Sequence, residues 1–422
     1  MTATRSTPDD TSSAASREGS LPPSGGGAPV SAGEGSKRRS GRGLGPKAYR
    51  AAGGAGGPDG IITVGVIGAT GYAGGELVRL LLHHPNVKLA GLHGRNRDNQ
   101  PIAASHPHLS ETGLVIDQAI PEADAVFTAL PHGVAAGMAA ELVANGAALL
   151  DVGPDFRLHD PADYPAWYKF DHPAADLLAQ AVYGLPELHR AEMSAAAERD
   201  ITIIGLPGCY PTATILTLAP LARAGLIGDL AVDAKSGVSG AGRDPKADIL
   251  FSEVNESVKA YGLFTHRHTA EMEQELQAQG RLGAGAKAGA VSGGGNGSAA
   301  NPGVAIVDFL PHLIPMTRGI LTSCHVRPTR PVTQAELDSL YAEAYRDEPF
   351  VQVVADPPST KHVFGSNLCR ICVKVDPRSG RILALGVIDN LVKGAAGQAV
   401  QALNVLFGLP ETTGLEQYPI AP

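Results

Sequence analysis

The sequence predicts an α/β fold in which a doubly wound parallel sheet precedes a second domain of α+β type with a mixed sheet. Up to residue 208, short apolar runs rich in β-branched residues alternate with helical stretches, the pattern of strand–helix–strand units. After residue 208, β-rich stretches follow one another with fewer helices between them. A chain of 422 residues with 43% hydrophobic residues is long and apolar enough for two or three domains.

Composition and charge exclude several classes of protein. The net charge of −8 argues against nucleic acid as the main partner. No apolar run approaches the roughly 20 residues of a membrane span, and no short apolar stretch near the start resembles a secretory signal. Four cysteines in 422 residues do not form a disulfide framework, so we expect a reducing, cytoplasmic location.

The first 60 residues are expected to be a disordered, low-complexity tail. Residues 1–58 are rich in Ser, Gly, Ala and Pro and have few large apolar side chains, so they cannot bury enough surface to offset the entropy of ordering. Their excess of Lys and Arg over Asp and Glu leaves an organellar transit peptide as an alternative. Asp9 and Asp10 weaken that alternative because transit peptides are poor in acids.

The first ordered domain is expected over residues 61–208. Its predicted strands are Ile61–Ile67, Val87–Leu92, Ala125–Leu130, Ala148–Val152 and Ile201–Ile204. A helix follows the first strand, over Glu76–Leu82, with apolar residues at helical spacing.

The second domain is expected over residues 209–388. Its predicted strands are Leu230–Lys235, Val304–Leu310, Leu321–Arg327, Leu368–Val375 and Ile382–Ile388. The insertion 283–303 is nearly all Gly, Ala, Ser and Asn and is predicted to be a flexible surface loop. The final segment, 389–422, contains a helix over Gly397–Asn404 that we expect to pack back on the first domain.

A glycine-rich turn separates the first strand from the first helix. Its spacing is GxxGxxG, from Gly68 through Gly74, which differs from the common GxGxxG fingerprint. Glycines there let the backbone approach a pyrophosphate, and the following helix N-terminus presents N–H donors to it. The turn therefore predicts dinucleotide binding, and its candidate cofactor residues are Gly68, Thr70, Gly71, Tyr72 and Gly74.

The residues after the second strand favour NADP over NAD. NAD sites usually carry an acidic residue there, which binds the ribose hydroxyls. This sequence instead has Arg95 and Arg97, and a basic group suits a 2′-phosphate. The alternative is that both arginines are only solvated.

Cys209 is the candidate nucleophile. It follows a predicted strand and a Leu206–Gly208 turn, and it stands at or just before a helix over Thr212–Leu221. A helix N-terminus lowers the pKa of a thiol toward the reactive thiolate. The other cysteines, Cys324, Cys369 and Cys372, lie in apolar strand patterns and are expected to be inert, and no metal site is predicted.

Two histidines are candidates for the acid/base partner of the thiol. His266 and His268 flank an arginine just before a helix that starts near Glu271. In an extended segment both side chains would lie on the same face. Which of the two transfers the proton is left open by the sequence.

Three arginines and a second small-residue loop complete the candidate site. Arginine binds carboxylates and phosphates through bidentate hydrogen bonds, so the candidate substrate ligands are Arg157, Arg243 and Arg267. The loop Ser236–Gly242 can bring N–H groups to a ligand, and its candidate cofactor residues are Ser236, Gly237 and Gly240.

Taken together, these motifs resemble the N-acetyl-γ-glutamyl-phosphate reductases, from about residue 61 to the C-terminus. The matching segments are Gly68–Glu76, Leu130–Gly133, Asp155–Leu158, Tyr183–Glu187, Gly208–Thr212, Ser236–Arg243, His266–His268 and Ile388–Gly394. The tail 1–58 and the insertion 283–303 depart from the family pattern.

The resemblance implies a Rossmann-type domain followed by a catalytic and dimerising α+β domain, with NADP(H) as cofactor and no metal. It implies that Cys209 is the nucleophile, that His266 or His268 is the acid/base and that Arg157 binds substrate. It also implies that Asn390 contacts the cofactor near the nicotinamide. The expected substrate is a small-molecule acyl phosphate that releases phosphate, and the expected assembly is a homodimer or homotetramer.

Three alternatives remain at this point. A sister semialdehyde dehydrogenase acting on aspartyl phosphate would share the cysteine, but its pattern places a glutamine shortly after the cysteine, where this chain has Tyr210-Pro211-Thr212. A reductase acting on a carrier-bound aminoadipyl or glutamyl phosphate is harder to distinguish. A non-catalytic NADP-binding sensor would have no need for a cysteine at a helix start together with paired histidines.

Overall fold

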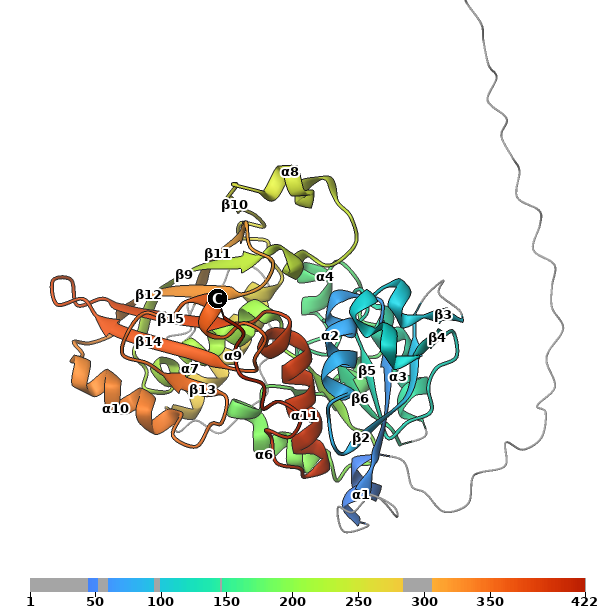
Figure 1. Cartoon of the computed structure of the whole chain (residues 1–422). Helices are drawn as coiled ribbons and strands as arrows, with labels where there is room; N and C mark the ends of the chain where they lie inside the picture. The colour runs from blue at the N-terminus through green and yellow to red at the C-terminus, as the bar shows by residue number, and fades with distance from the viewer. Residues whose placement is uncertain (1–44, 52–59, 95–98, 145, 284–305, 422) are drawn as a thin grey trace, which may run out of the picture. The chain divides into compact units, whose positions relative to one another are not determined.

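The computed structural model describes residues 45–51, 60–94, 99–144, 146–283 and 306–421, which lie in one compact unit. Arg95, the insertion 284–303 and residues 1–44 lie outside the described residues. Two sheets dominate the described chain, and Figure 1 shows them with α11 (Gly397–Phe407) running beside the first. The fold is therefore of the predicted class, a doubly wound sheet followed by a mixed sheet.

The first sheet has eight strands in the order β3-β4-β2-β1-β5-β6-β8-β7. Every described pairing in it is parallel except that of β3 with β4. Its strands are β1 Ile62–Ile67, β2 Val87–His93, β3 Gln100–Pro101, β4 Val115–Asp117, β5 Ala125–Thr128, β6 Ala148–Asp151, β7 Val182–Tyr183 and β8 Ile203–Gly205. Because the strand order reverses between β1 and β5, the crevice at their carboxyl ends is the expected ligand site of such a sheet.

Three helices in this part of the chain have ten or eleven residues: α2 Tyr72–Leu81, α3 Val134–Val143 and α6 Pro186–Ala196. Two are shorter, α4 Asp163–Trp167 and α5 Ala175–Leu178. Two 3₁₀ segments, η2 Ile102–Ala104 and η3 Pro107–Thr112, lead into β4.

The second sheet has seven strands in the order β10-β11-β9-β12-β15-β14-β13. β9 pairs with β11 in parallel, as β13 does with β14, and the other pairings are antiparallel. Its strands are β9 Ile227–Gly237, β10 Lys259–Ala260, β11 Val307–Ile314, β12 Ile320–Pro328, β13 Val351–Val353, β14 Cys369–Val375 and β15 Ile382–Ile388.

One face of the second sheet is covered by helices. These are α7 Cys209–Arg223, α9 His268–Gly283 and α10 Gln334–Ala344. The short segments η4 Val238–Ala241, η5 Ala247–Ile249 and α8 Phe251–Val254 join β9 to β10, and η6 Thr360–His362 precedes β14. Figure 1 shows α8 and its flanking loops standing away from the sheet.

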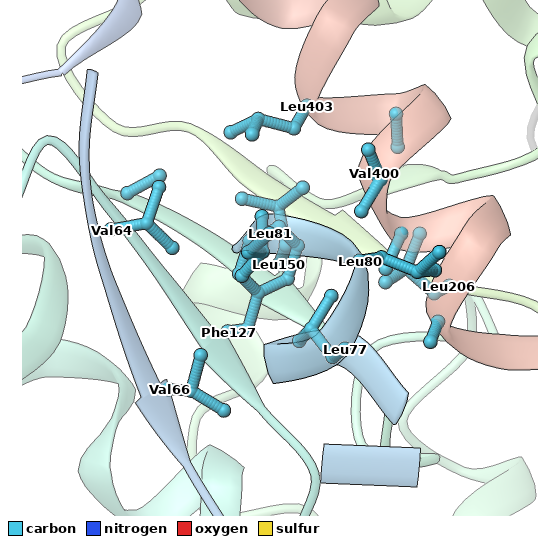
Figure 2. Close-up of a cluster of buried hydrophobic side chains, with 14 of the residues drawn as sticks. Val64, Val66, Leu77, Leu80, Leu81, Phe127, Leu150, Leu206, Val400 and Leu403 are labelled. Atoms are coloured by element: carbon cyan, nitrogen blue, oxygen red, sulfur yellow. The ribbon is translucent and has the colours of Figure 1, made fainter. Parts of the chain in front are cut away.

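After β15 the chain returns to the first sheet through a π-helical turn, η7 Val392–Ala396, and α11. Figure 2 shows Val400 and Leu403 of α11 beside Leu77 and Leu80 of α2 in a fully buried apolar cluster. Every residue of α11 is buried. The helix lies between other elements rather than at a surface, and its buried polar residues Gln398, Gln401 and Asn404 are hydrogen-bonded within the protein.

One expectation about the tail is wrong. Residues Pro46–Ala51 form a short helix, α1, within the segment expected to be disordered. Tyr49 is buried and packs edge-on against Phe407, with ring centroids 5.3 Å apart. Arg50 donates to the carbonyls of Val405 and Leu406, each at 2.7 Å, and thereby satisfies the C-terminal carbonyls of α11. Local composition missed this helix because its partners are about 350 residues away.

Candidate active site

A cavity of about 330 Å³ lies at the carboxyl ends of β1, β5, β6 and β8. It is bounded by the loops after these strands, the start of α7, the loop after β9 and the segment after β15. Of the predicted site residues, the cavity is lined by Gly71, Tyr72, Gly74, Arg157, Cys209, Gly240, Arg243, Arg267, His268 and Asn390. Segments from both sheets therefore converge at one place.

Cys209 is the first residue of α7 and lies at the cavity wall. Glycines surround it closely. A Cβ atom on Gly394 would lie 2.8 Å from the Cys209 Cβ, and one on Gly208 would lie 2.5 Å from Nε2 of His268. Both positions exclude a larger residue, so glycine is required on two sides of the residue pair Cys209 and His268.

The expectation of a lowered thiol pKa is wrong for the protein without ligands. Burial raises the pKa of Cys209, although the Arg157 guanidinium, the Tyr210 backbone N–H and Arg267 act in the opposite direction. Desolvation outweighs the favourable charges and the helix start. Cys209 is therefore a thiol at neutral pH.

Of the two predicted histidines, His268 lines the cavity with Cys209, and His132 from the loop after β5 lines it as well. His268 is the first residue of α9, so the extended segment expected for the pair ends before it. Arg157 lies close to it, with Nη1 3.5 Å from Nε2 of His268. Burial, together with the nearby His266 and arginines, lowers the pKa of His268 well below its ordinary value. The ring is thus neutral and able to accept a proton.

His266 lies behind His268 and is absent from the cavity wall. Its ring centroid is 4.7 Å from that of His268, and it packs edge-on against Tyr210, Tyr261 and Phe309. Its Nδ1 accepts from the His268 backbone N–H at 3.2 Å. Burial and Arg267 lower its pKa to about 4. His266 therefore supports the position of His268 at the start of α9.

Arg157 is buried beneath the cavity rather than extended into it. Its Nε donates to the Leu206 carbonyl at 2.6 Å and its Nη2 to the Val152 carbonyl at 2.9 Å. Its Nη1 is 3.6 Å from Oε2 of the fully buried Glu271. Since all three guanidinium nitrogens have neighbours within the protein, a ligand of Arg157 would share these donors.

Glu271 was not a candidate in the sequence. Its Oε1 accepts from the Tyr183 hydroxyl at 2.7 Å and from the Gly208 backbone N–H at 2.8 Å. It therefore joins α9 to the turn that carries Cys209. The only signal for it was its position one helical turn after His268, and burial of an acid cannot be read from that spacing.

The glycine turn has the geometry expected of a dinucleotide site. Gly68 has φ +90°, and a Cβ atom on Gly74 would lie 2.2 Å from the Gly68 carbonyl oxygen. Gly71 precedes the first residue of α2, and the first turn of this helix, whose N–H groups have no partner within the helix, lines the cavity. Gly68 and Thr70 shape the turn but do not line the cavity.

The second loop divides into residues that shape it and residues that face the cavity. Ser236 is buried and donates to the Gly237 carbonyl, and a Cβ on Gly237 would clash with the backbone at Thr317–Arg318. Gly240 lines the cavity. Asn390 does too, but its side chain accepts from the Gly319 N–H at 2.7 Å and donates to the Ser239 hydroxyl at 2.9 Å. Asn390 therefore ties three segments together at the cavity wall.

Within the described ranges, no group of three or more His, Cys, Asp and Glu side chains is arranged to hold a metal ion. All four cysteines are free. Among the described helices, none has both the length and the apolar character needed to cross a membrane.

Two family models match this chain. The model described as semialdehyde dehydrogenase, NAD binding domain, matches residues 63–196, and the model described as semialdehyde dehydrogenase, dimerisation domain, matches residues 209–390. The boundary between the two matches falls just before Cys209.

Curated relatives match over most of their length. A protein of Desulforudis audaxviator named N-acetyl-gamma-glutamyl-phosphate reductase is 46% identical, over 84% of this chain and 98% of its own. Proteins of the same name from Symbiobacterium thermophilum and Heliobacterium modesticaldum are 48% and 46% identical, covering 84% and 86% of this chain and 97% and 100% of theirs.

Solved structures share the fold at low sequence identity. An aspartate semialdehyde dehydrogenase II of Vibrio cholerae, complexed with ASA, gives a TM-score of 0.59 at 16% identity, over 82% of this chain and 98% of that one. An aspartate semialdehyde dehydrogenase with NADP from Candida albicans gives 0.59 at 15% identity, with the same coverage. At this identity the likeness concerns the fold alone.

Proposed function

This chain belongs to the N-acetyl-γ-glutamyl-phosphate reductase family, and we propose that its cavity converts N-acetyl-L-glutamyl 5-phosphate to the 5-semialdehyde with NADPH, a step of arginine biosynthesis. The observation that carries the proposal is the meeting of Cys209, His268 and the glycine turn around one cavity. Cys209 supplies a nucleophile, His268 a proton acceptor and the turn a dinucleotide cradle.

The glycine turn fits the cofactor. The close approach of Gly74 to the Gly68 carbonyl leaves no room for side chains there, which is the arrangement a pyrophosphate requires. The residues that would hold the dinucleotide are Gly71, Tyr72, Gly74 and Gly240. When bound, the reduced nicotinamide supplies a hydride to the carbon held at Cys209.

The first chemical step is formation of a thioester. His268 takes the Cys209 proton, and the thiolate attacks the acyl carbon, so that a C–S bond forms and the C–O bond to phosphate breaks. Inorganic phosphate leaves with the bonding electrons. Both groups begin neutral, so the proton can pass from sulfur to imidazole. Because burial raises the pKa of Cys209 and lowers the pKa of His268, this transfer is uphill in the free protein.

In the second step the thioester carbon becomes the aldehyde. Once the carbon is reduced, the C–S bond breaks and the electron pair returns to the Cys209 sulfur. Backbone N–H groups at the start of α7 would bind the developing oxyanion. When the oxyanion collapses to the aldehyde and the C–S bond breaks, His268 returns its proton to the Cys209 sulfur, which regenerates the thiol. Arg157 and Glu271 hold His268 and the Gly208 turn in place.

The substrate is expected to be bound by Arg267 and by the Nη1 group of Arg157. Arg267 is exposed and lines the cavity close to Cys209, whose pKa it lowers against burial. A guanidinium at this place suits the phosphate or the α-carboxylate of the substrate.

We place the reaction in the cytoplasm, which the four free thiols support. A homodimer or homotetramer is supported by the match to a dimerisation domain. It is also supported by exposed apolar side chains on α8 and in the loop after β10, where Phe251 and Phe264 are 79% and 77% exposed.

The test is reduction of NADP in the reverse direction, followed by its absorbance. The purified full chain is given N-acetylglutamate semialdehyde, phosphate and NADP, with aspartate semialdehyde as the control substrate. We expect phosphate-dependent turnover that prefers the acetylated aldehyde and is lost in Cys209→Ser. Preference for aspartate semialdehyde would transfer the assignment to the sister enzyme, and activity only on a carrier-bound aldehyde would transfer it to that class.

A further inference from the structure

Arg243 lies at the interface between the second loop and the glycine turn. Its Nη1 donates to the Thr70 carbonyl at 3.0 Å, across 173 residues of sequence. It is exposed and lines the cavity together with Gly71–Gly74. An arginine that belongs to the segment after β9 thus reaches the turn that opens α2.

Most of the Arg243 hydrogen-bonding capacity is unused. Within the part of the chain that the structure describes, the Thr70 carbonyl is its sole hydrogen-bond acceptor and no carboxylate pairs with it. A guanidinium has five N–H donors, so a fork of parallel donors remains for an anion. The residue before it, Gly242, has φ +88°, a conformation that only glycine adopts easily, and this turn directs Arg243 toward the glycine loop.

The cavity arginines differ in what they approach. Arg157 and Arg267 are near Cys209 and act on the thiol pKa. Arg243 instead acts on His106, whose Nε2 contacts the Ala69 carbonyl at 3.0 Å behind the glycine turn. Arg243 therefore lies on the cofactor side of the cavity. The sequence had instead predicted it as a ligand of the substrate.

We propose that Arg243 binds the pyrophosphate of the dinucleotide and joins the second domain to the occupied glycine turn, rather than binding the acyl phosphate. Thr70 lies two residues before Tyr72, the first residue of α2, and the pyrophosphate of a dinucleotide lies at this helix N-terminus in such sheets. A guanidinium held there by one hydrogen bond adds a positive charge, opposite to that of the pyrophosphate, beside the N–H donors of the helix. The inference rests on the proposed function because it assumes the same cofactor.

The test separates cofactor binding from substrate binding. Arg243→Ala and Arg243→Lys are compared with Arg267→Ala, a cavity arginine on the cysteine side. Affinities for NADPH and for NADH are measured without substrate by nicotinamide fluorescence, and KM for the acyl phosphate is measured at saturating NADPH. Thermal unfolding of each variant identifies any loss of fold.

We expect Arg243→Ala to weaken NADPH and NADH by the same factor, about 10- to 100-fold, with KM for the acyl phosphate changed by less than about twofold. Arg243→Lys should recover part of the loss because it keeps the charge but not the fork. Arg267→Ala should show the reverse pattern, with unchanged nucleotide affinity and a raised substrate KM.

Two results would overturn the assignment. Unchanged nucleotide affinity with a raised substrate KM would make Arg243 a substrate ligand, and a loss confined to NADPH would place it at the 2′-phosphate. A wild-type protein that binds neither nucleotide would reject the proposed function itself, and the inference with it, and that result is recognised before any variant is made.

Discussion

At the level of single residues, the cavity contains two groups that are neutral at neutral pH. Cys209 keeps its proton and His268 lacks one, since burial raises the pKa of the thiol and lowers the pKa of the imidazole. Glu271, which holds the Gly208 turn, is itself fully buried. The thiolate fraction of Cys209 in the free protein is therefore small at pH 7 and grows as the pH rises.

The raised thiol pKa makes a direct prediction for alkylation. The rate of iodoacetamide labelling of Cys209 in the free protein should rise by about tenfold per pH unit from pH 7 to pH 9, because the thiolate fraction grows throughout that range. Mass spectrometry of the labelled peptide measures the rate, with Cys209→Ala as the background. A rate that levels off below pH 8 would contradict the raised pKa.

At the level of elements, the π-helical turn η7 is the part that most directly shapes the nucleophile's surroundings. Gly394 in this turn approaches the Cys209 side chain. The turn is held by the fully buried Lys393, whose Nζ donates to Glu187 at 2.5 Å and to Gln401 at 2.7 Å. Single π turns are frequent at functional sites, and this one is anchored to α6 and α11.

Gly394→Ala should lower kcat by at least about tenfold, because the added Cβ would lie 2.8 Å from the Cys209 Cβ and displace either the turn or the thiol. The matched control is Gly137→Ala in α3, where an added Cβ meets nothing within 4 Å. Turnover and thermal unfolding are measured for both. Equal activity of the two variants would show that the approach at Gly394 is not critical.

Element boundaries show what sequence patterns can and cannot provide. β1 and β12 were predicted to within a residue because apolar β-branched runs mark buried strands. The short strands β3 and β13 have no such pattern, since pairing at a sheet edge alone defines them. Likewise, the spacing of the glycines alone predicts the glycine turn. That His268 lines the cavity and His266 does not depends on the start of α9 at His268, which local spacing does not reveal.

At the level of the whole molecule, an ion pair of a buried carboxylate joins the first sheet's helix α2 to the turn between β11 and β12. Arg318 donates to both oxygens of Glu76, at 3.1 and 2.9 Å, and Arg79 is the second partner of this carboxylate. Burial would raise the pKa of Glu76, but the hydrogen bonds from Arg318 and Arg79 lower it to about 2.

The resemblance to known reductases predicted the substrate and the cofactor from the sequence. Pairs between residues far apart in the sequence, such as Glu76 and Arg318, could be identified only from the structure.

This pair predicts an acid-sensitive contribution to stability. Since the folded pKa of Glu76 lies below its ordinary value of 4.5, its stabilisation is complete above pH 4.5 and is lost as the pH falls from 4.5 toward 2. Glu76→Gln should therefore cost about 3 kcal/mol of unfolding free energy at pH 7 and much less at pH 3. Urea unfolding at both pH values measures the difference.

The control for this measurement is Glu336→Gln, which removes a partner of Arg330 at the exposed surface. Its effect should be small at either pH because water screens such pairs. A Glu76→Gln variant that loses the same free energy at pH 3 as at pH 7 would show that lost packing, rather than charge, causes the effect.

The chain passes between the two sheets twice, once from β8 into α7 and once from β15 into η7, and the two passages touch where Gly394 meets Cys209. The nucleophile therefore lies at the junction of the two passages and does not belong to one sheet alone. Substitutions in either passage act on the same few atoms, so their effects on turnover are expected to be non-additive when they are combined.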